Sequence, residues 1–397
     1  MARKKILLAY ITSYSGHHKA ASAIIEALNQ LSGGEKLISK NLGKGVELIK
    51  LGNGNEVLCV DFLRYLHPIG RIIVEKSYLR MLKKNPQTWE YLYDNPEVYG
   101  RLQKWIDRLG VWKFPKLARL IEKFDPDIAC CTQAFPALML ADFKQHSSLK
   151  MALTPIVGVF TDYAPHRYWV HPEINLYVVP SKEMGKVLVE KGISERRIRD
   201  FGIPIDPRFI LNSPNKGDTL KKFGLNEFLP VVLVMGGSRG LGSIKEAIEE
   251  LEKSFFSLQL VVVCGLNKKL QKKLEKITPA LRCPVKIIGY TENIDELMKI
   301  SSVIITKPGG LTVSECLACE LPMILVNPIP GQEALNARFL AERDLAVIAS
   351  DGKEAAAVVI RLLKNEQARQ RMRFQARAFR RPDAALAIAN ALIKGWD

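Results

Sequence analysis

Long apolar segments are missing from this chain of 397 residues. No stretch approaches the roughly 20 apolar residues of a membrane-spanning helix, so any contact with a membrane is expected to be peripheral. The apolar run at residues 6–11 follows Arg3, Lys4 and Lys5, as it would in a signal peptide. The run is too short for one and has no cleavage-type segment, so we expect a buried first strand there.

Cysteine is scarce, and the seven residues have no disulfide-like spacing. This usage is typical of the reduced thiols of a cytosolic protein. Cys316 and Cys319 form one C-x-x-C pair inside a helical apolar pattern, without a second pair. We therefore expect ordinary burial there and no metal site. The G-x-x-x-x-G-K-[ST] motif is also missing, which excludes a P-loop ATPase.

Acidic residues are too few to balance the basic ones, because 41 Asp and Glu stand against 58 Lys and Arg, a net charge of +17. Such a charge favours anionic partners: phosphate-bearing substrates, nucleic acid or an acidic membrane surface. Nucleic acid is not expected, because the charge alone supports it and no recognisable binding motif accompanies the charge.

The sequence does contain a regular alternation of strand-length apolar runs and helix-period segments, which predicts an α/β fold with parallel sheets. In the first half we expect a strand at 5–12, a turn at 13–18 and a helix at 19–31. The second half restarts this pattern, so a second, doubly wound domain is expected. Its strands are predicted at 231–235, 258–264, 285–289, 302–306 and 323–327, with a helix from Ser243.

Two regions interrupt the alternation. Turn-forming residues are dense at 202–207 and 212–218, where we place a linker between domains at 1–205 and 206–397. Residues 62–124 are helical in pattern, basic and rich in aromatic residues, a composition that suits the interface of an anionic bilayer. The alternative is a helical excursion whose aromatic side chains pack inward.

The second half contains a glycine-rich turn, Gly236–Gly242, between a strand and a helix. Backbone N–H groups and the helix dipole favour a phosphate at such a turn, and Arg239 adds a mobile cation. The glycine order differs from G-x-G-x-x-G, and the next strand ends without an acidic residue, so NAD is not expected. The alternative is that these glycines only permit a tight turn.

A second turn of this kind, Thr306–Glu315, contains the pair Gly309 and Gly310. Glu315 follows Thr312 by three residues, which is the spacing of a capping box, so its carboxylate would satisfy the first helical turn. The alternative is that it accepts hydrogen bonds from the hydroxyls of a ribose. Local spacing leaves both interpretations open.

His17 and His18 follow the first strand, at the carboxyl edge of the sheet where α/β enzymes bind ligands. A histidine there can act as a general base near neutral pH, although a lone histidine is more often structural. Another polar cluster, residues 161–172, follows a strand expected at 156–160. It contains two His and an Asp, but their spacing is not that of a helix-borne metal site, so no metal is expected.

These residues together resemble a known family. Residues 15–24 are similar to the glycine-histidine-alanine signature of the monogalactosyldiacylglycerol synthase and diacylglycerol glucosyltransferase family. Lys307–Thr312 with Glu315, and Asn327–Glu333 with Asn336, resemble the nucleotide-sugar motif that this family shares with glycosyltransferase family 28.

The resemblance continues through residues 161–172 and 202–209 and covers nearly the whole chain. Two segments depart from the family pattern. Tyr14-Ser15-Gly16 replaces a glycine-rich run, and residues 131–136 (CTQAFP) replace a Thr-His pair before Phe-Pro. Both departures concern the acceptor side.

The resemblance implies a GT-B fold, in which two Rossmann-like doubly wound domains face each other across a cleft. The first domain would bind the acceptor and an anionic membrane surface, and the second the nucleotide sugar, with the last helix packing back on the first. The implied reaction is inverting, metal-independent transfer of a hexose from a UDP-sugar to diacylglycerol, without a cofactor, at the cytoplasmic face of the cell membrane. The alternatives are a UDP-N-acetylglucosamine transferase acting on a polyprenyl-diphosphate lipid, and a nucleotide-sugar epimerase or hydrolase.

The same resemblance implies roles for individual residues. His17 would take the proton of the acceptor hydroxyl, with Asp162 as an orienting carboxylate or rival base. The donor residues would be Gly237, Arg239, Gly309 and Gly310 at the diphosphate, Glu315 at the ribose, Gln332 and Glu333 at the sugar, and Gly240, Tyr290, Thr312 and Asn336 as further contacts.

Overall fold

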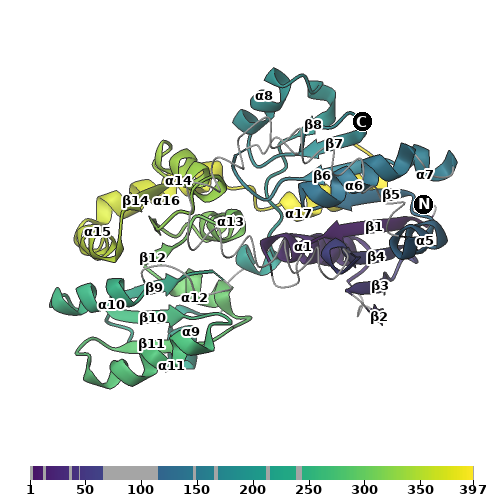
Figure 1. Ribbon diagram of the computed structural model, residues 1–397. Coiled ribbons are helices and arrows are strands. Elements are labelled where there is room, and N and C mark those ends of the chain that lie inside the picture. The colour runs from purple at the N-terminus through teal and green to yellow at the C-terminus, as the bar shows by residue number, and fades with distance from the viewer. Residues whose placement is uncertain are drawn as a thin grey trace. The chain divides into compact units, whose positions relative to one another are not determined.

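The computed structural model forms two compact units (Figure 1). The first unit comprises residues 1–207, 330–332 and 381–397, and the second comprises residues 208–329 and 333–380. The structure describes residues 3–11, 15–34, 38–43, 45–65, 115–145, 149–164, 169–211, 215–237 and 244–396. Most of the basic, aromatic region predicted at 62–124 therefore lies outside the described residues.

The first unit is built on an eight-stranded sheet in the order β2-β3-β4-β1-β5-β6-β7-β8. The strands from β4 to β8 are parallel, as the alternation predicted, but β3 pairs antiparallel with both β2 and β4. This edge is absent from the sequence prediction because β2 is exposed along its whole length and has no apolar pattern. The strands are β1 (Lys5–Tyr10), β2 (Ile38–Gly43), β3 (Val46–Lys50), β4 (Glu56–Asp61), β5 (Ile128–Cys131), β6 (Ile156–Val159), β7 (Ile174–Val178) and β8 (Ile198–Arg199).

Helices cover both faces of this sheet, so the central strands are apolar on both sides. Along β1, Ile6 and Leu8 pack with α1 and α17, whereas Leu7 and Ala9 pack with α5 and α6. The chain returns after the second unit to place α17 against α1. The helices of this unit are α1 (Gly16–Leu31), α5 (Pro115–Phe124), α6 (Ala134–Gln145), α7 (Leu149–Leu153), α8 (Lys182–Glu190) and α17 (Ala384–Lys394).

The second unit contains six parallel strands in the order β11-β10-β9-β12-β13-β14. This is the strand order of dinucleotide-binding doubly wound domains, so the predicted topology is confirmed. The prediction at 231–235 is confirmed residue for residue, and the other four strands agree within two residues. The last strand, β14, was not predicted. The strands are β9 (Val231–Met235), β10 (Gln259–Val263), β11 (Val285–Ile288), β12 (Val303–Thr306), β13 (Met323–Val326) and β14 (Ala346–Ala349).

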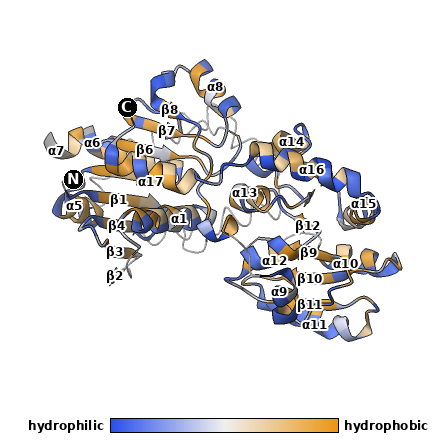
Figure 2. Cartoon of the chain, turned by 180° about the vertical axis from the view of Figure 1, so that it is seen from behind, coloured by the Kyte–Doolittle hydropathy of each residue, from blue (hydrophilic) through white to orange (hydrophobic). Residues whose placement is uncertain are grey.

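Helices enclose the second sheet. Figure 2 shows the strands β9 and β10 in hydrophobic orange and the Arg-rich helix α16 mostly in hydrophilic blue. The last part of the second stretch expected to be linker is instead the start of α9, from Lys216, which Asn215 caps. The helices that lie wholly or mainly in this unit are α9 (Lys216–Phe223), α10 (Ile244–Lys253), α11 (Lys268–Ile277), α12 (Ile294–Ile300), α13 (Gly310–Ala318), α14 (Gln332–Ala341), α15 (Gly352–Lys364) and α16 (Glu366–Phe379).

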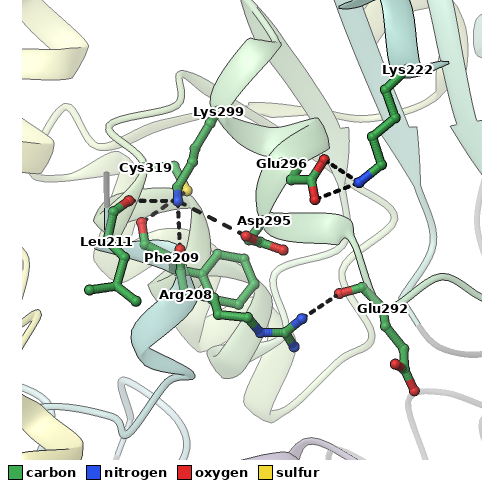
Figure 3. A network of polar contacts seen from close by, with 9 residues as sticks. All are labelled: Arg208, Phe209, Leu211, Lys222, Glu292, Asp295, Glu296, Lys299 and Cys319. Atoms are coloured by element: carbon green, nitrogen blue, oxygen red, sulfur yellow. Dashed lines mark hydrogen bonds and ion pairs between the residues drawn. The ribbon is translucent and has the colours of Figure 1, made fainter. Parts of the chain in front are cut away.

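The chain enters the second unit through a segment that is fixed to α12 (Figure 3). Lys299 of α12 donates hydrogen bonds to the carbonyl oxygens of Arg208 at 2.5 Å and Leu211 at 2.9 Å. Its ammonium group lies 4.0 Å from the carboxylate of Asp295. Cys319 Sγ, at the end of α13, donates to the carbonyl oxygen of Phe209 at 3.8 Å. These contacts hold residues 208–211 as part of the second unit.

Among the described residues, no helix is long and apolar enough to cross a membrane. All seven cysteines carry free thiols. Burial raises the pKa of the Cys316 thiol well above its usual range and the pKa of Cys319 to about 12, so both stay protonated at neutral pH. The C-x-x-C pair is therefore a pair of packed thiols.

Candidate active site

In the first unit, the candidate site lies where the strand order reverses. In the sheet, β1 lies between β4 and β5. The chain fills the sheet on the β4 side first, through α1 and the hairpin β2-β3, and then on the other side from β5 to β8. Ligands of open α/β sheets bind at the carboxyl ends of the two strands at such a switch point. His17 follows β1 and Thr132 follows β5, so both lie at this point.

The helix that carries the histidines begins earlier than the sequence suggested. Ser15 is its N-cap, and the Ser15 hydroxyl accepts a hydrogen bond from the backbone N–H of His18. The prediction of a turn over residues 13–18 is therefore wrong for its last part, since His17 and His18 lie in the first turn of α1. The serine cap holds this turn in helical conformation.

The imidazole of His17 is held on one side by two oxygen atoms. Nδ1 lies 3.0 Å from the carbonyl oxygen of Thr132 and 2.9 Å from the hydroxyl of Thr161. The Thr132 hydroxyl in turn donates to the carbonyl oxygen of His17 at 2.9 Å. Burial lowers the pKa of His17 from 6.5 to about 4, and the Thr132 carbonyl offsets part of that shift. The ring is thus neutral at pH 7 and can accept a proton.

His18 has a different environment from its neighbour. Its ring packs edge-to-face on Tyr10, with centroids 4.8 Å apart. Burial lowers the pKa of His18, and the charges of Asp61 and Glu47 oppose the shift. This contact explains His18 as a packing residue of α1.

Asp162 is half-buried and directly follows Thr161 at the end of β6. Next to it, the buried ring of Phe160 stacks on Trp169 at 4.5 Å. His171 serves the loop, since its Nδ1 accepts from the backbone N–H of Glu173 and its carbonyl accepts from the hydroxyl of Tyr177. No group of three or more His, Cys, Asp or Glu that could hold a metal occurs in the described part of the chain.

The departure at residues 131–136 has a local explanation. Gln133 Oε1 accepts a hydrogen bond from the backbone N–H of Phe135 at 2.5 Å, so this side chain holds the first turn of α6. Sequence reasoning missed Thr132 as a site residue, because its contact with His17 spans 115 positions along the chain.

In the second unit, the strand order reverses between β9 and β12, and both predicted phosphate turns follow these two strands. Gly237, two residues after the end of β9, has a φ of 68°, a conformation that favours glycine. Arg239 and Gly240 lie outside the described residues. After β12, Gly309 is the N-cap of α13, which no side chain caps. The Thr306 hydroxyl is buried and has no hydrogen-bond partner within the described segments.

The position of Glu315 rules out one of its two interpretations. Because α13 begins at Gly310 with Gly309 as its cap, Thr312 is the third residue of the helix and not its N-cap. The capping-box interpretation is therefore wrong. Glu315 lies inside the helix with 4% of its surface exposed, and ribose binding stays a prediction.

The loop after β13 is tied to the loop after β12. Glu333 accepts from the backbone N–H of Ile329 at 2.9 Å and pairs with Lys307 at 3.1 Å. Asn336 is fully buried and donates to the carbonyl oxygen of Pro308 at 3.0 Å. Glu333 and Asn336 therefore join the two loops, and the contribution of Lys307 was not foreseen. The donor contacts of Gln332, at the start of α14, and of the exposed Tyr290 stay predictions.

Two family models match the chain. Residues 17–205 match monogalactosyldiacylglycerol (MGDG) synthase, and residues 231–388 match the glycosyltransferase family 28 C-terminal domain. A processive diacylglycerol beta-glucosyltransferase of Bacillus cereus is 32% identical over 344 residues, which cover 85% of each chain. The chain belongs to the monogalactosyldiacylglycerol synthase and processive diacylglycerol glucosyltransferase family. A relative of the same name from Bacillus mycoides is 29% identical over 392 residues, 98% of this chain and 93% of its own.

Solved structures show the fold of this family member to be GT-B, as predicted. UDP-GlcNAc 2-epimerase from Neisseria meningitidis, bound to UDP-GlcNAc, aligns with a TM-score of 0.59 at 13% identity, covering 98% of this chain and all of its own. MurG of Acinetobacter baumannii aligns with a TM-score of 0.55 at 13% identity, covering 98% of this chain and 99% of its own. At such low identity these likenesses establish the fold alone.

Proposed function

We propose that the chain transfers a hexose from a UDP-sugar to diacylglycerol, with inversion at the anomeric carbon and without a catalytic metal. The observation that carries this proposal is the match of nearly the whole chain, through both units, to relatives named processive diacylglycerol beta-glucosyltransferase. The hexose is left open, because the matching family model is named for a galactolipid synthase and the relatives for glucosyl transfer.

His17 is the proposed general base. Its neutral imidazole takes the proton of the acceptor hydroxyl as that oxygen forms a bond to the anomeric carbon. The bond from the anomeric carbon to the diphosphate breaks in the same step, and UDP leaves with the electron pair. A single displacement of this kind inverts the configuration. The transition state has oxocarbenium character, as in glycoside hydrolysis. Asp162 is the proposed orienting carboxylate or rival base.

The turns after β9 and β12 are the proposed diphosphate site. The start of α13 directs backbone N–H groups and the positive end of the helix dipole at an anion. With Arg239 and Gly237 from the other turn, this arrangement compensates the charge of the departing diphosphate without a metal. Glu315 is the proposed ribose ligand.

The test is a panel of donors and acceptors with the purified full-length protein. UDP-glucose, UDP-galactose and UDP-N-acetylglucosamine are each combined with diacylglycerol in mixed micelles, with a polyprenyl-diphosphate lipid, or with no acceptor. We expect one UDP-hexose to give a glycosyl diacylglycerol, whose anomeric configuration NMR couplings report, with turnover unchanged by EDTA. Transfer only to the polyprenyl lipid, or turnover of donor without any acceptor, would each refute the proposal.

The membrane is the proposed place of action, at its cytoplasmic face. The excess positive charge and the basic, aromatic region at 62–124 support binding to anionic lipid, with about 1 kcal/mol per Lys or Arg near the surface. Flotation with anionic vesicles is therefore expected to fall steeply as salt rises, because salt screens this attraction. Equal binding to neutral vesicles would contradict this arm of the proposal.

A further inference from the structure

We propose that Thr132 and Thr161 are positioning residues that orient the His17 ring, and that the Thr132 carbonyl holds it in the tautomer with its proton on Nδ1, so that Nε2 is the nitrogen that accepts the substrate proton. The role of Nε2 in the reaction rests on the proposed function, whereas the tautomer itself follows from the geometry of the first unit.

The Thr132 carbonyl decides where the ring proton sits. A carbonyl oxygen can only accept, and it lies 3.0 Å from Nδ1, so this contact is a hydrogen bond only when Nδ1 carries hydrogen. With the proton on Nε2, the lone pairs of Nδ1 and the carbonyl oxygen would face each other. The second neighbour of Nδ1, the Thr161 hydroxyl at 2.9 Å, can donate or accept and so adapts to either tautomer. The carbonyl therefore favours Nδ1–H.

The Thr132 side chain fixes the carbonyl in place. Its hydroxyl donates to the His17 carbonyl at 2.9 Å, so the two residues are joined by a pair of hydrogen bonds that run in opposite directions. Thr132 is fully buried and Thr161 is 5% exposed, so water does not replace these contacts. This pair of hydrogen bonds links the start of α1 with the segment that enters α6, at the point where the strand order of the sheet reverses.

The same two oxygens stabilise His17 after it has taken the proton. The imidazolium keeps its Nδ1–H, which becomes a stronger donor, towards the Thr132 carbonyl and the Thr161 hydroxyl. In many catalytic histidines a carboxylate fills this position. The two neutral oxygens also orient the ring, but they add no negative charge that would favour its protonated form. The arrangement thus favours a free base before the reaction and still supports the charged ring during it.

The experiment measures the tautomer directly on the full-length protein. Uniform ¹⁵N labelling of histidine and a long-range ¹H–¹⁵N correlation separate protonated from unprotonated ring nitrogens, and His17→Gln assigns the signal among the six histidines. At pH 7 we expect wild-type His17 to show a protonated Nδ1 and an unprotonated Nε2. Thr132→Val removes the hydroxyl that fixes the carbonyl and should move the signals towards the other tautomer. Thr161→Val should keep Nδ1–H, because the Thr161 hydroxyl fits either tautomer and the carbonyl stays in place. Thr132→Ser and Thr161→Ser, which keep the hydroxyl, should retain the wild-type pattern.

Turnover provides the second readout. Replacing a residue that orients a catalytic group typically lowers activity by about 10- to 100-fold. Each valine variant should therefore lose about tenfold in kcat, with the KM for UDP-sugar unchanged. The matched control is Thr154→Val, which removes a buried hydroxyl that donates to the Pro126 carbonyl at 3.1 Å in the same unit. This control should lose stability without any change in the His17 signals or in kcat.

Three outcomes would overturn the inference: a wild-type His17 with its proton on Nε2, a charged ring at pH 7, or a Thr132→Val variant that keeps both the tautomer and kcat. A different result separates the inference from the proposed function. If His17 shows Nδ1–H but His17→Ala turns over at the wild-type rate, the base role is refuted and the tautomer assignment stands.

Discussion

The two units place a helix start at the same topological position and use it differently. In the first unit, α1 begins at the switch point beside β1 and β5, and the Ser15 hydroxyl caps it. In the second unit, α13 begins at the switch point beside β9 and β12, and its N-cap is Gly309, which has no side chain to offer.

The difference shows how one physical feature can serve two purposes. Every helix start has backbone N–H groups without a partner in the helix and a positive potential. The serine of α1 satisfies one of these donors, and the positive potential adds to the burial that already disfavours a proton on His17 in the first turn. The glycine of α13 has no side chain to satisfy these donors, and in the proposed function they and the same potential hold the diphosphate. A capped start thus suits a neutral base, and an uncapped one suits a diphosphate.

Replacing the base tests the first half of this comparison and has the largest expected effect. A general base typically contributes 10²- to 10⁴-fold, so His17→Ala should lower kcat by about 100-fold or more. The affinity for UDP, measured by calorimetry, should stay unchanged because the turns proposed to bind the donor lie in the second unit. His18→Ala is the control and should be milder, since His18 packs on Tyr10. Near-normal turnover of the His17 variant would reject the base role.

The sequence predicted the second unit better than the first for a physical reason. A parallel sheet covered on both faces gives uninterrupted apolar runs such as Val231–Met235, where all five residues are buried. The antiparallel edge strand β2 is fully exposed, so no hydrophobic pattern specifies it. The start of α1 was placed three residues late, because Gly16, His17 and His18 are poor helix formers and the cap at Ser15 offsets their low propensity.

The residues of the candidate site likewise differ in whether their neighbours in the sequence were enough to identify them. Gly309 and Gly310 could be found from their place between a strand and a helix. The neighbours of His17 could not, because Thr132 and Thr161 are separated from it by 115 and 144 positions along the chain. For Glu315, local spacing was misleading: it suggested a capping box with Thr312, but α13 begins at Gly310, so Thr312 is not its N-cap.

Giving α13 the cap that α1 has should weaken donor binding. In Gly309→Ser the new hydroxyl would accept from the first-turn N–H groups proposed to hold the diphosphate. The backbone at Gly309, with φ −73° and ψ 133°, accepts any residue, and a Cβ there meets no atom within 4 Å. We expect the Kd for UDP to rise about tenfold, or 1.4 kcal/mol, while stability rises by a few tenths of a kcal/mol.

Calorimetry with UDP and thermal unfolding measure these two effects on the same sample. Gly309→Ala is the matched control, because it fills the same space without offering an acceptor to the backbone. If the serine variant binds UDP as tightly as the wild type, the start of α13 does not hold the diphosphate and the comparison of the two helix starts fails.

Removing the cap from α1 is the reciprocal change. Ser15→Ala deletes the acceptor of the His18 N–H and should cost about 1 kcal/mol of unfolding free energy, the usual value of an N-cap. Chemical denaturation measures this loss, and UDP affinity should not change. Ser15→Asp should restore most of the stability, since aspartate is an equally good N-cap. Full stability in the alanine variant would show that the first turn of α1 is held by other contacts.

The pH profile should show the smallest change of all, and that flatness tests the electrostatic part of the comparison. A general base works only when unprotonated, and the pKa of His17 is lowered to about 4 because burial disfavours the charged ring. Between pH 7.5 and 5.5 the neutral fraction of such a group stays nearly complete, so its effect on kcat/KM should be less than about twofold. With an ordinary pKa of about 6.5, the neutral fraction of a histidine, and with it kcat/KM, would fall about tenfold over the same range.

Initial rates measured across this range, with UDP affinity measured in parallel as the control, distinguish the two cases. A tenfold fall by pH 5.5 with constant UDP affinity would show that burial and the start of α1 do not keep His17 neutral.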